Sequence, residues 1–592
     1  MKTGLFASLL AFDLFAIASV NTFSMTALAQ ENSSLKLVYP PTAHQTTAAQ
    51  IFFIGTAPPE SEVTINDSPV QRSPAGHFAP SFPLTLGENQ FQIRTNDQTI
   101  TLTITRIPAI SAPPTTATFA PDSLEPKVDW RYPVGEVLCF SAIANPAAQV
   151  AVSVGPLTLP LTLVPNAAQL SSNSAVLTGQ STTQTQTGQF QGCTRFTQPG
   201  DYGQPIYKLT WQGSAIAEPA PGRLTITDEQ TFEPVEVISP AGVARTGPST
   251  QYSRLTPLPQ GAQDIVTARV GGWLRLGYGG WIKASETRPL ANNLYPRSTI
   301  AGVFSKSTPA GLQLEFPLTT PVPISIHQGD RRFTLSLHNT TAKTDTIRLD
   351  DNPLVKRLDW QQSTPNRLDY HFELKTSQQW GYQVSYEANR LVLLLREPPR
   401  IDANNPLLDR TILIDPGHGG EELGARGPDG TPEKAVNLGV SLLLAQELER
   451  RGATVVLSRD RDEFVSLGDR ADLIARTEPD VAISIHYNAL PDAGNAEETA
   501  GVGIFWYQPQ AHSLAIQLHE TLTTELGRPS YGVFWNNLAL TRPYAAPSVL
   551  LELGFMINPQ EFEWIMDPRE QSQLAIAIAD SLETWFRESQ EP

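Results

Sequence analysis

The chain has 592 residues, which is too long for one hydrophobic core and predicts several domains. Its 50 prolines exceed the roughly 5% share that is average for proteins, and they indicate β-rich modules joined by stiff linkers. The formal net charge of −17 argues against a nucleic-acid partner, because phosphate binding requires a basic face.

The first 29 residues have the pattern of a signal peptide. Lys2 supplies a short positive region, an apolar stretch follows, and Ala27-Leu28-Ala29 forms a small-x-small cleavage site. Downstream of it, the sequence has no run of about 18 apolar residues, so no transmembrane anchor is expected after cleavage. The sequence therefore predicts an exported protein of the periplasm or cell wall.

Residues 35–107 alternate short β-rich segments with turns. Strand signals that recur about every 8–12 residues are typical of a β-sandwich. The segments SEVTIND and GHFAPSFPLTLGENQF resemble bacterial immunoglobulin-like modules. No chemistry is expected here, and His77 and Asp67 are interpreted as loop residues.

A proline-rich segment, 108–124, is predicted to be a linker, and 125–228 is predicted to form a second β-rich domain. The middle of that domain, 165–192, is rich in Ser, Thr, Gln and Asn and should be a long exposed loop. Cys139 and Cys193 lie in the same region. An even pair in an exported protein predicts a disulfide, and the alternative is two buried thiols.

Residues 232–288 contain a glycine-rich hairpin, WLRLGYGGWI, between Trp273 and Trp281. This pattern resembles the bacterial Src-homology-3-like domain, which often binds peptidoglycan peptides. At least one of the two tryptophans should belong to the core of a small barrel. A role in a binding groove stays open for Tyr252 or Tyr278.

Residues 294–398 are again strand-rich, with LQLEFPLTTPVPISIHQ and LVLLLREPP among the segments. They resemble the AMIN-type module of cell-envelope proteins. His327 lies here in PISIHQ, but neither a glycine-rich loop nor an isolated strand glutamate accompanies it. We therefore interpret His327 as a surface strand histidine.

Residues 404–592 alternate apolar strand patterns with amphipathic helices, which predicts an α/β domain with a mostly parallel sheet flanked by helices. The predicted fold class is thus multidomain, with β-sandwich and small-barrel modules before this α/β domain. Helices are expected over 433–451, 466–476, 510–526 and 570–588, and strands over 411–414, 454–458, 480–488 and 501–507.

Three residues of this last region form a candidate metal site. His418 follows the apolar run Thr411–Ile414 in a glycine-rich loop, at the end of a strand where open α/β sheets place their sites. His486 closes another apolar strand, and Glu433 begins a helix. Two histidines and one carboxylate with an open fourth position are the ligand set of catalytic zinc sites. The sequence therefore predicts Zn²⁺, which lowers the pKa of bound water to about 7 and polarises the carbonyl under attack.

Glu552 is the candidate general base. It lies inside the apolar strand SVLLELGF, where burying an unpaired carboxylate costs several kcal/mol. Such a group needs a partner or a catalytic task, and a hydrolytic metal site requires a second carboxylate.

These motifs, DPGHGG, EKAVNL, SIHYNA and LLELGFMIN in this order, resemble the zinc-dependent N-acetylmuramoyl-L-alanine amidases of the type-3 family over about residues 409–588. The resemblance implies that His418, Glu433 and His486 bind zinc and that Glu552 acts in catalysis. Some members insert a helical plug between the second histidine and this glutamate. Only 65 residues separate the two here, which leaves little room for one.

The expected function is therefore that of an exported peptidoglycan hydrolase, which cleaves the amide between N-acetylmuramic acid and L-alanine and is targeted by its AMIN-like and Src-homology-3-like modules. An envelope activator protein is a possible partner. Two alternatives stay open: a non-catalytic peptidoglycan-binding scaffold, and a zinc peptidase acting within the stem peptide. Only the family resemblance selects the sugar–peptide bond.

Overall fold

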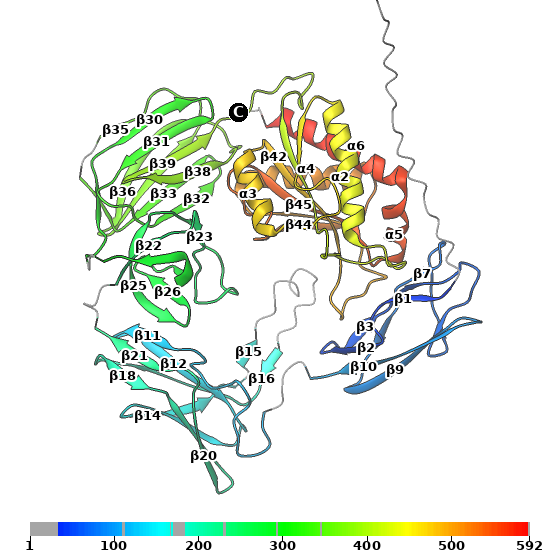
Figure 1. Cartoon of the computed structure of the whole chain (residues 1–592), viewed down its shortest axis with the longest axis horizontal. Helices are drawn as coiled ribbons and strands as arrows, with labels where there is room; N and C mark the ends of the chain where they lie inside the picture. The colour runs from blue at the N-terminus through cyan, green and yellow to red at the C-terminus, as the bar shows by residue number, and fades with distance from the viewer. Residues whose placement is uncertain are drawn as a thin grey trace, which may run out of the picture.

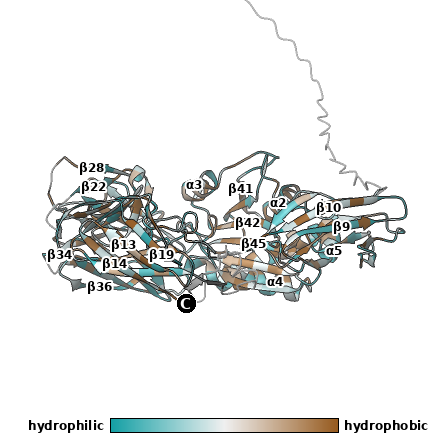
Figure 2. Ribbon diagram, turned by 90° about the horizontal axis from the view of Figure 1, so that it is seen from below, coloured by the Kyte–Doolittle hydropathy of each residue, from teal (hydrophilic) through white to brown (hydrophobic). Residues whose placement is uncertain are grey.

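The structure is a computed structural model that describes residues 34–108, 113–165, 167–169, 184–228, 233–291, 294–343 and 346–589. The predicted signal peptide and the centre of the predicted exposed loop lie outside these residues. Four β domains precede one α/β domain, and the first domain returns to lie against the last (Figure 1). The multidomain, β-rich architecture with a C-terminal α/β domain is confirmed. Figure 2 shows hydrophobic residues concentrated on the strands inside the domains.

The first domain consists of short strands around a core of its own that includes Ile51, Phe53 and Phe91. Its sheets have the orders β1-β4-β7, β2-β10-β9-β5-β6 and β3-β8. The strands are β1 (Lys36–Tyr39), β2 (Ala43–Thr46), β3 (Gln50–Phe52), β4 (Ile54–Thr56), β5 (Thr64–Ile65), β6 (Ser68–Pro69), β7 (His77–Phe78), β8 (Ser81–Pro83), β9 (Gly87–Arg94) and β10 (Thr99–Arg106).

The prediction that His77 is a loop residue is wrong. His77 lies on strand β7 and is only 6% exposed, whereas Asp67 does lie in the turn between β5 and β6. The Nδ1 atom of His77 is 3.0 Å from the hydroxyl of Thr56, and its ring packs edge-on against Phe562 of the α/β domain. A contact across 485 residues of sequence buries this histidine, and a local pattern cannot reveal it.

The second domain contains a six-stranded sheet, β12-β17-β14-β13-β19-β20, in which Cys139 and Cys193 face each other on β12 and β17 and are disulfide-bonded. Its strands are β11 (Trp130–Pro133), β12 (Val137–Ile143), β13 (Gln149–Val154), β14 (Leu157–Leu163), β15 (Ala167–Gln169), β16 (Gln184–Gln186), β17 (Gln189–Arg195), β18 (Gly200–Gly203), β19 (Ile206–Trp211), β20 (Ser214–Pro219) and β21 (Leu224–Thr227). The end of the predicted linker belongs to this domain, because Phe119 and Leu124 are buried in its core.

The third domain is a small β domain that shares a sheet with the second. Strand β25 pairs with β11, so the sheet order β18-β21-β11-β25-β22-β28 crosses the domain boundary. Trp281 is 6% exposed, which fits the core role expected for at least one of the two tryptophans. The elements are β22 (Pro234–Val237), β23 (Ala241–Gly242), β24 (Leu258–Pro259), β25 (Gln263–Val270), β26 (Trp273–Leu276), β27 (Trp281–Lys283), η1 (Ala284–Glu286) and β28 (Thr287–Pro289).

The fourth domain has two main antiparallel sheets, β35-β30-β31-β39-β38 and β32-β33-β37-β36, around one apolar core; β35 alone joins in parallel. His327 is exposed on β32, as expected for a surface strand histidine. The strands are β29 (Ser298–Ile300), β30 (Val303–Thr308), β31 (Gly311–Pro317), β32 (Ile324–Gly329), β33 (Arg332–His338), β34 (Thr340–Ala342), β35 (Ile347–Arg348), β36 (Val355–Thr364), β37 (Arg367–Leu374), β38 (Tyr382–Glu387) and β39 (Arg390–Arg396).

The C-terminal domain is built on a six-stranded sheet of order β41-β40-β42-β45-β43-β44. Every neighbouring pair is parallel except β43 and β45, which are antiparallel. The elements are β40 (Thr411–Pro416), α2 (Glu433–Arg450), β41 (Thr454–Leu457), α3 (Leu467–Thr477), β42 (Val481–Asn488), β43 (Val502–Trp506), η2 (Pro509–Ala511), α4 (His512–Thr524), β44 (Ser530–Trp535), β45 (Ser548–Phe555), α5 (Pro559–Met566) and α6 (Pro568–Glu588).

Helices cover both faces of this sheet because the strands are apolar on both faces. Ile412 and Ile414 of β40 point into the main core with α2, α4 and α6, whereas Leu413 between them packs with Ile474 of α3 on the other face. In the part of the chain that the structure describes, no helix is long and apolar enough to cross a membrane. The three-layer arrangement leaves the strand ends free to carry a site.

Two β domains hold the C-terminal domain from different sides. Phe52 and Ile54 of the first domain share a buried cluster with Phe555 and Ile557, which follow or end β45. From the fourth domain, Trp380 is 2% exposed and stacks on Phe586 of α6, with ring centroids 6.0 Å apart. The α/β domain is therefore not an independent body on a flexible tether.

Candidate metal centre

The loop that carries His418 begins where β40 ends at Pro416. His418 itself has a φ of +59°, and the two glycines after it also have positive φ angles, so the chain turns sharply here. Gly417 has no room for a side chain, because a Cβ atom there would lie 2.2 Å from Cε1 of His486. The glycine-rich motif thus lets the loop pass directly beside the second histidine.

Two buried arginines fix this loop by its backbone. Arg459, 2% exposed, donates to the carbonyls of Pro416 and Gly417, each at 2.9 Å. Arg470, 3% exposed, donates to the carbonyl of His418 at 2.7 Å and pairs with Asp415 at 2.5 Å. The charge-assisted hydrogen bonds from both guanidinium groups therefore hold the backbone of the loop in place.

Glu433 is the first residue of α2, and its side chain is 4% exposed. Its Oε1 atom accepts from the side chain of Asn437 at 3.0 Å and from the backbone N–H of Tyr487 at 3.1 Å. Its Oε2 atom accepts from the backbone N–H of Ala425 at 2.8 Å. Burial alone would raise the pKa of Glu433, but hydrogen bonds and charge interactions with the two histidines lower it below its usual range.

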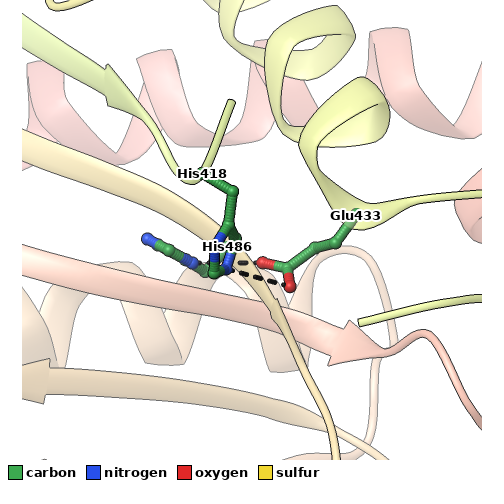
Figure 3. Close-up of side chains that lie close together, drawn as sticks. All are labelled: His418, Glu433 and His486. Carbon is green, nitrogen blue, oxygen red and sulfur yellow. Dashed lines mark hydrogen bonds and ion pairs between the residues drawn. The ribbon is translucent and has the colours of Figure 1, made fainter. Parts of the chain in front are cut away.

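The two histidines converge on this carboxylate from different elements (Figure 3). The Nε2 atom of His418 lies 3.2 Å from Oε2 of Glu433, and the Nδ1 atom of His486 lies 3.1 Å from Oε1. The two rings meet edge to face with centroids 4.9 Å apart. The hydrogen bond to Glu433 raises the pKa of His418 above its ordinary value.

Glu552 lies beside this cluster on the central strand β45. It is directly opposite His486 of β42 in the parallel register and opposite Gly503 of β43. Its Oε2 atom is buried and has no hydrogen-bond partner among the described residues. Burial, and then the nearby charge of Glu433, raises the pKa of Glu552 well above its usual value. A buried carboxylate without a partner is costly, and it indicates a functional position.

The cluster fits a metal ion. One ligand atom from each of His418, Glu433 and His486 can be chosen so that all lie within 4.8 Å of one another. Gly424 keeps the space open, since a Cβ atom there would lie 2.4 Å from Oε2 of Glu433 and 2.7 Å from the His418 ring. Two imidazoles and one carboxylate form a donor set suited to Zn²⁺ with one position left for a reactant. The hydrogen bonds from Asn437 and Ala425 would orient the ligating carboxylate.

The structure brings together all four residues that the sequence analysis selected. Sequence reasoning missed three supporting residues, Arg459, Arg470 and Asn437. Asn437 could have been noticed, because it stands four residues after Glu433 and therefore on the same helix face. The two arginines had no such signal, since a lone arginine in a sequence is usually exposed.

The mixed α/β domain thus gathers two histidines and two carboxylates in one place: His418 follows β40, Glu433 begins α2, His486 lies on β42 and Glu552 lies on β45. Comparison with known proteins is more specific. Residues 412–584 match the family model described as N-acetylmuramoyl-L-alanine amidase. This match lies within the C-terminal domain.

Individual relatives are similar to the same part of the chain. "Probable cell wall amidase LytH" of Staphylococcus epidermidis is 35% identical over 188 residues, which are 31% of this chain and 61% of the relative, and its Staphylococcus aureus counterpart is 36% identical over 186 residues. This chain thus spans about three-fifths of the length of these curated relatives. Among solved structures, N-acetylmuramoyl-L-alanine amidase AmiC2 of Nostoc punctiforme is 30% identical and covers 30% of this chain and 96% of its own, with a TM-score of 0.29. The amidase of Clostridium difficile 630 is 31% identical and covers 31% of this chain and 99% of its own, also with a TM-score of 0.29.

Proposed function

We propose that this protein is an exported, zinc-dependent peptidoglycan amidase that hydrolyses the amide between the lactyl group of N-acetylmuramic acid and L-alanine. The observation that carries the proposal is the convergence of His418, Glu433 and His486 beside the unpartnered carboxylate of Glu552. The family match of residues 412–584 supports the choice of bond. The relatives named as cell wall amidases support a substrate outside the cytoplasm.

His418, Glu433 and His486 would hold the zinc ion. When bound, zinc would polarise the carbonyl of the scissile amide and make water more acidic. Other residues of the chain would position the three ligands. Arg459 and Arg470 hold the backbone on either side of His418 and so fix the position of its ring. Asn437 holds the carboxylate of Glu433 at Oε1.

Glu552 would move the proton. Its buried Oε2 atom would take a proton from the attacking water and deliver it to the departing alanine nitrogen, so that one group acts first as base and then as acid. No covalent intermediate with the protein is required. The products are a carboxylate on the lactyl group and a free amino group on L-alanine.

The four β domains would place this domain at the cell wall. A chain that contacts a polymer through several modules gains a high effective concentration at its substrate. The resemblance of residues 232–288 to bacterial Src-homology-3-like domains, and of residues 294–398 to AMIN-like modules, supports targeting to the envelope.

The decisive experiment identifies the bond that is broken. Purified sacculi are digested with the full chain and zinc, labelled at new amino termini and analysed by mass spectrometry. We expect alanine as the new terminus, peptide-free glycan strands and loss of activity with a chelator. A different terminal residue would reveal a stem peptidase, and the absence of any product would favour a non-catalytic scaffold.

Two variants separate metal binding from proton transfer. His418→Ala should lose both metal and activity, whereas Glu552→Gln should keep the metal while turnover falls by on the order of 10²–10⁴. Glu525→Gln is the matched control, because Glu525 is exposed at the end of α4 in the same domain. If Glu552→Gln also lost the metal, Glu552 would be a ligand and the assignment of roles would be wrong.

A further inference from the structure

Strand β45 is irregularly paired just after Glu552. In the pairing of β42 with β45, His486 lies opposite Glu552, but the next pair joins Asn488 to Phe555, so that a step of two residues on β42 matches a step of three on β45. In the pairing of β43 with β45, the last pair at this end is Gly503 with Glu552. The backbone that follows Glu552 therefore needs a support other than a regular ladder.

The carboxylate of Glu561 supplies this support. Glu561 lies in the first turn of α5 and is 4% exposed. Its Oε1 atom accepts from the backbone N–H of Gly501, just before β43, at 2.9 Å. Its Oε2 atom accepts from the backbone N–H of Phe555, at the end of β45, at 2.6 Å. One side chain thus bridges the two strands directly beyond the pair of Gly503 with Glu552.

A glycine allows the side chain of Glu561 to approach the strand this closely. Gly554 has a φ of +125°, and a Cβ atom there would lie 3.0 Å from the ring of Trp564 and 3.3 Å from Oε2 of Glu561. A larger residue would strain the backbone and displace both neighbouring side chains. Gly554 is therefore the point at which α5 can lie directly against β45.

Asn558 fixes the helix turn that carries Glu561. It is the N-cap of α5 and is 3% exposed, and its side-chain oxygen accepts from the backbone N–H of Glu561 at 3.0 Å. Its side-chain nitrogen donates to the carbonyls of Glu497 and Thr499, each at 3.2 Å, in the segment before β43. The first turn of α5 is thus held by buried contacts of its own, which restricts where the carboxylate of Glu561 can lie.

A carboxylate is costly at this place. Burial raises the pKa of Glu561 to about 7, although the two backbone N–H groups and the charge of Arg528 oppose this rise. Arg528 is itself paired with Glu570, and among the described residues no cation forms an ion pair with Glu561. A glutamine would avoid burying a charge, but only one of its two terminal atoms can accept a hydrogen bond. Two accepting oxygens are the property that a glutamine of the same shape lacks.

We propose that Glu561 is a positioning residue of the metal centre: by tying the end of β45 to the start of β43, it holds the carboxylate of Glu552 in place for proton transfer. Glu561 itself would not touch the substrate. A displacement of about 1 Å in a reacting group can cost on the order of 10² in rate, so a tie that holds Phe555 bears directly on turnover. This inference rests on the proposed function for the reaction that Glu552 carries out.

The test compares Glu561→Gln with Glu563→Gln in the full chain. Glu563 lies on the same helix, and its Oε1 atom accepts from the backbone N–H of Ala75 in the first domain at 2.8 Å. A glutamine can still accept this single hydrogen bond. At position 561, however, it leaves one of the two backbone N–H groups facing an amide NH2 group. Glu563→Gln should therefore behave as the wild type does.

Three properties of each variant are measured. The kcat and KM are determined on a soluble muropeptide, and the zinc content is determined by mass spectrometry. Amide hydrogen exchange is followed in peptides that contain Gly501 and Phe555, the two residues whose N–H groups Glu561 accepts. Glu561→Gln is also combined with Glu552→Gln, because a residue that acts through Glu552 should have little effect once that carboxylate is absent.

We expect Glu561→Gln to lower kcat by about 10- to 100-fold, because Glu552 is displaced. The KM and the zinc content should stay unchanged, since in the described part of the chain no hydrogen bond or ion pair joins Glu561 to the three metal ligands. At least one of the two amides should exchange about tenfold faster. In the Glu552→Gln chain, the added change should lower the remaining turnover by less than about twofold, whereas a purely structural residue would lower turnover by the same factor in both chains.

Full kcat in Glu561→Gln, or the same reduction of turnover with and without Glu552, would overturn the proposal. Unchanged exchange at both amides would also overturn it, because the tie between the strands would then not depend on Glu561. Loss of zinc or of the fold in Glu561→Gln would assign Glu561 to stability instead. A wild-type chain that hydrolyses no muropeptide would refute the proposed function itself, and the exchange of Gly501 and Phe555 would then show separately whether the tie exists.

Discussion

The interface between the first domain and the C-terminal domain provides the sharpest test of how the site is supported. The segment that follows His486 on β42 depends on this interface. Tyr39 donates to Asp492, His44 lies 2.9 Å from the same carboxylate, and Gln50 donates to the carbonyl of Ala493 at 2.7 Å. Removing the interface should therefore loosen a segment that starts directly after a proposed metal ligand.

The perturbation is Phe52→Ala, and Phe53→Ala is its matched control. Phe52 is 2% exposed and packs in the cluster shared with Phe555 and Ile557 of the C-terminal domain. Its neighbour Phe53 points to the other side, into the core of the first domain, 4.9 Å from the ring of Phe91. The two variants delete the same group from adjacent positions, but only one deletion lies between the domains.

Each buried Phe→Ala change costs about 3–5 kcal/mol. For Phe52 this cost falls on docking and shifts the docked-to-undocked ratio by a factor of about 10²–10⁴, whereas for Phe53 it falls on the stability of the first domain. Limited proteolysis with mass spectrometry should show faster cleavage within residues 489–500 for Phe52→Ala while the first domain stays folded. Hydrolysis of a soluble muropeptide should fall in parallel.

The reasoning would be refuted if Phe52→Ala protected residues 489–500 as well as the wild type does and kept full activity. In that case the segment would be held by the C-terminal domain alone, and the first domain would only target the protein. Phe53→Ala should instead show unfolding of the first domain, visible as an early transition in calorimetry.

Two further predictions concern stability. Arg470→Ala leaves Asp415 buried without its cation and should lower the free energy of unfolding by about 3–5 kcal/mol in denaturant titrations, and a loss below about 1 kcal/mol would contradict this. In the fourth domain, burial and then the charge of Arg367 lower the pKa of His338 from 6.5 to about 4, so the unfolded chain binds more protons between these values. Stability should therefore fall by about 3 kcal/mol as the pH falls through this window, and His338→Gln should remove that slope; an identical slope in the variant would show that another group is responsible.

The candidate site could be predicted because each of its residues stands in a local pattern. His418 and His486 follow apolar strands, and Glu552 interrupts one, so burial and chemistry are visible within a few residues of sequence. Because the strands are parallel, their carboxyl ends meet at one edge of the sheet. Local sequence patterns are therefore sufficient to select these residues as candidates.

The remaining features depend on contacts between residues far apart in the chain. The burial of His77 requires Phe562, and the ordering of Asp492 requires Tyr39 and His44, which lie more than 440 residues earlier. Arg459 lies in a loop rich in charged residues and becomes buried only because the glycine-rich loop folds over it. Hydrophobic periodicity reports which residues are buried within one element, but it does not report which domain covers them.

Neighbouring domains hold both ends of β45, the strand that carries Glu552. Before β45, Tyr544 stacks on Tyr382 of the fourth domain with ring centroids 4.7 Å apart, and Arg396 donates to the carbonyl of Ala545 at 2.8 Å. At its other end, Phe555 packs against the first domain. The strand that carries Glu552 is thus fixed at both ends by domains outside the family match. Surfaces engaged in this support are unavailable to the polymer, so binding must use faces that the domains leave exposed.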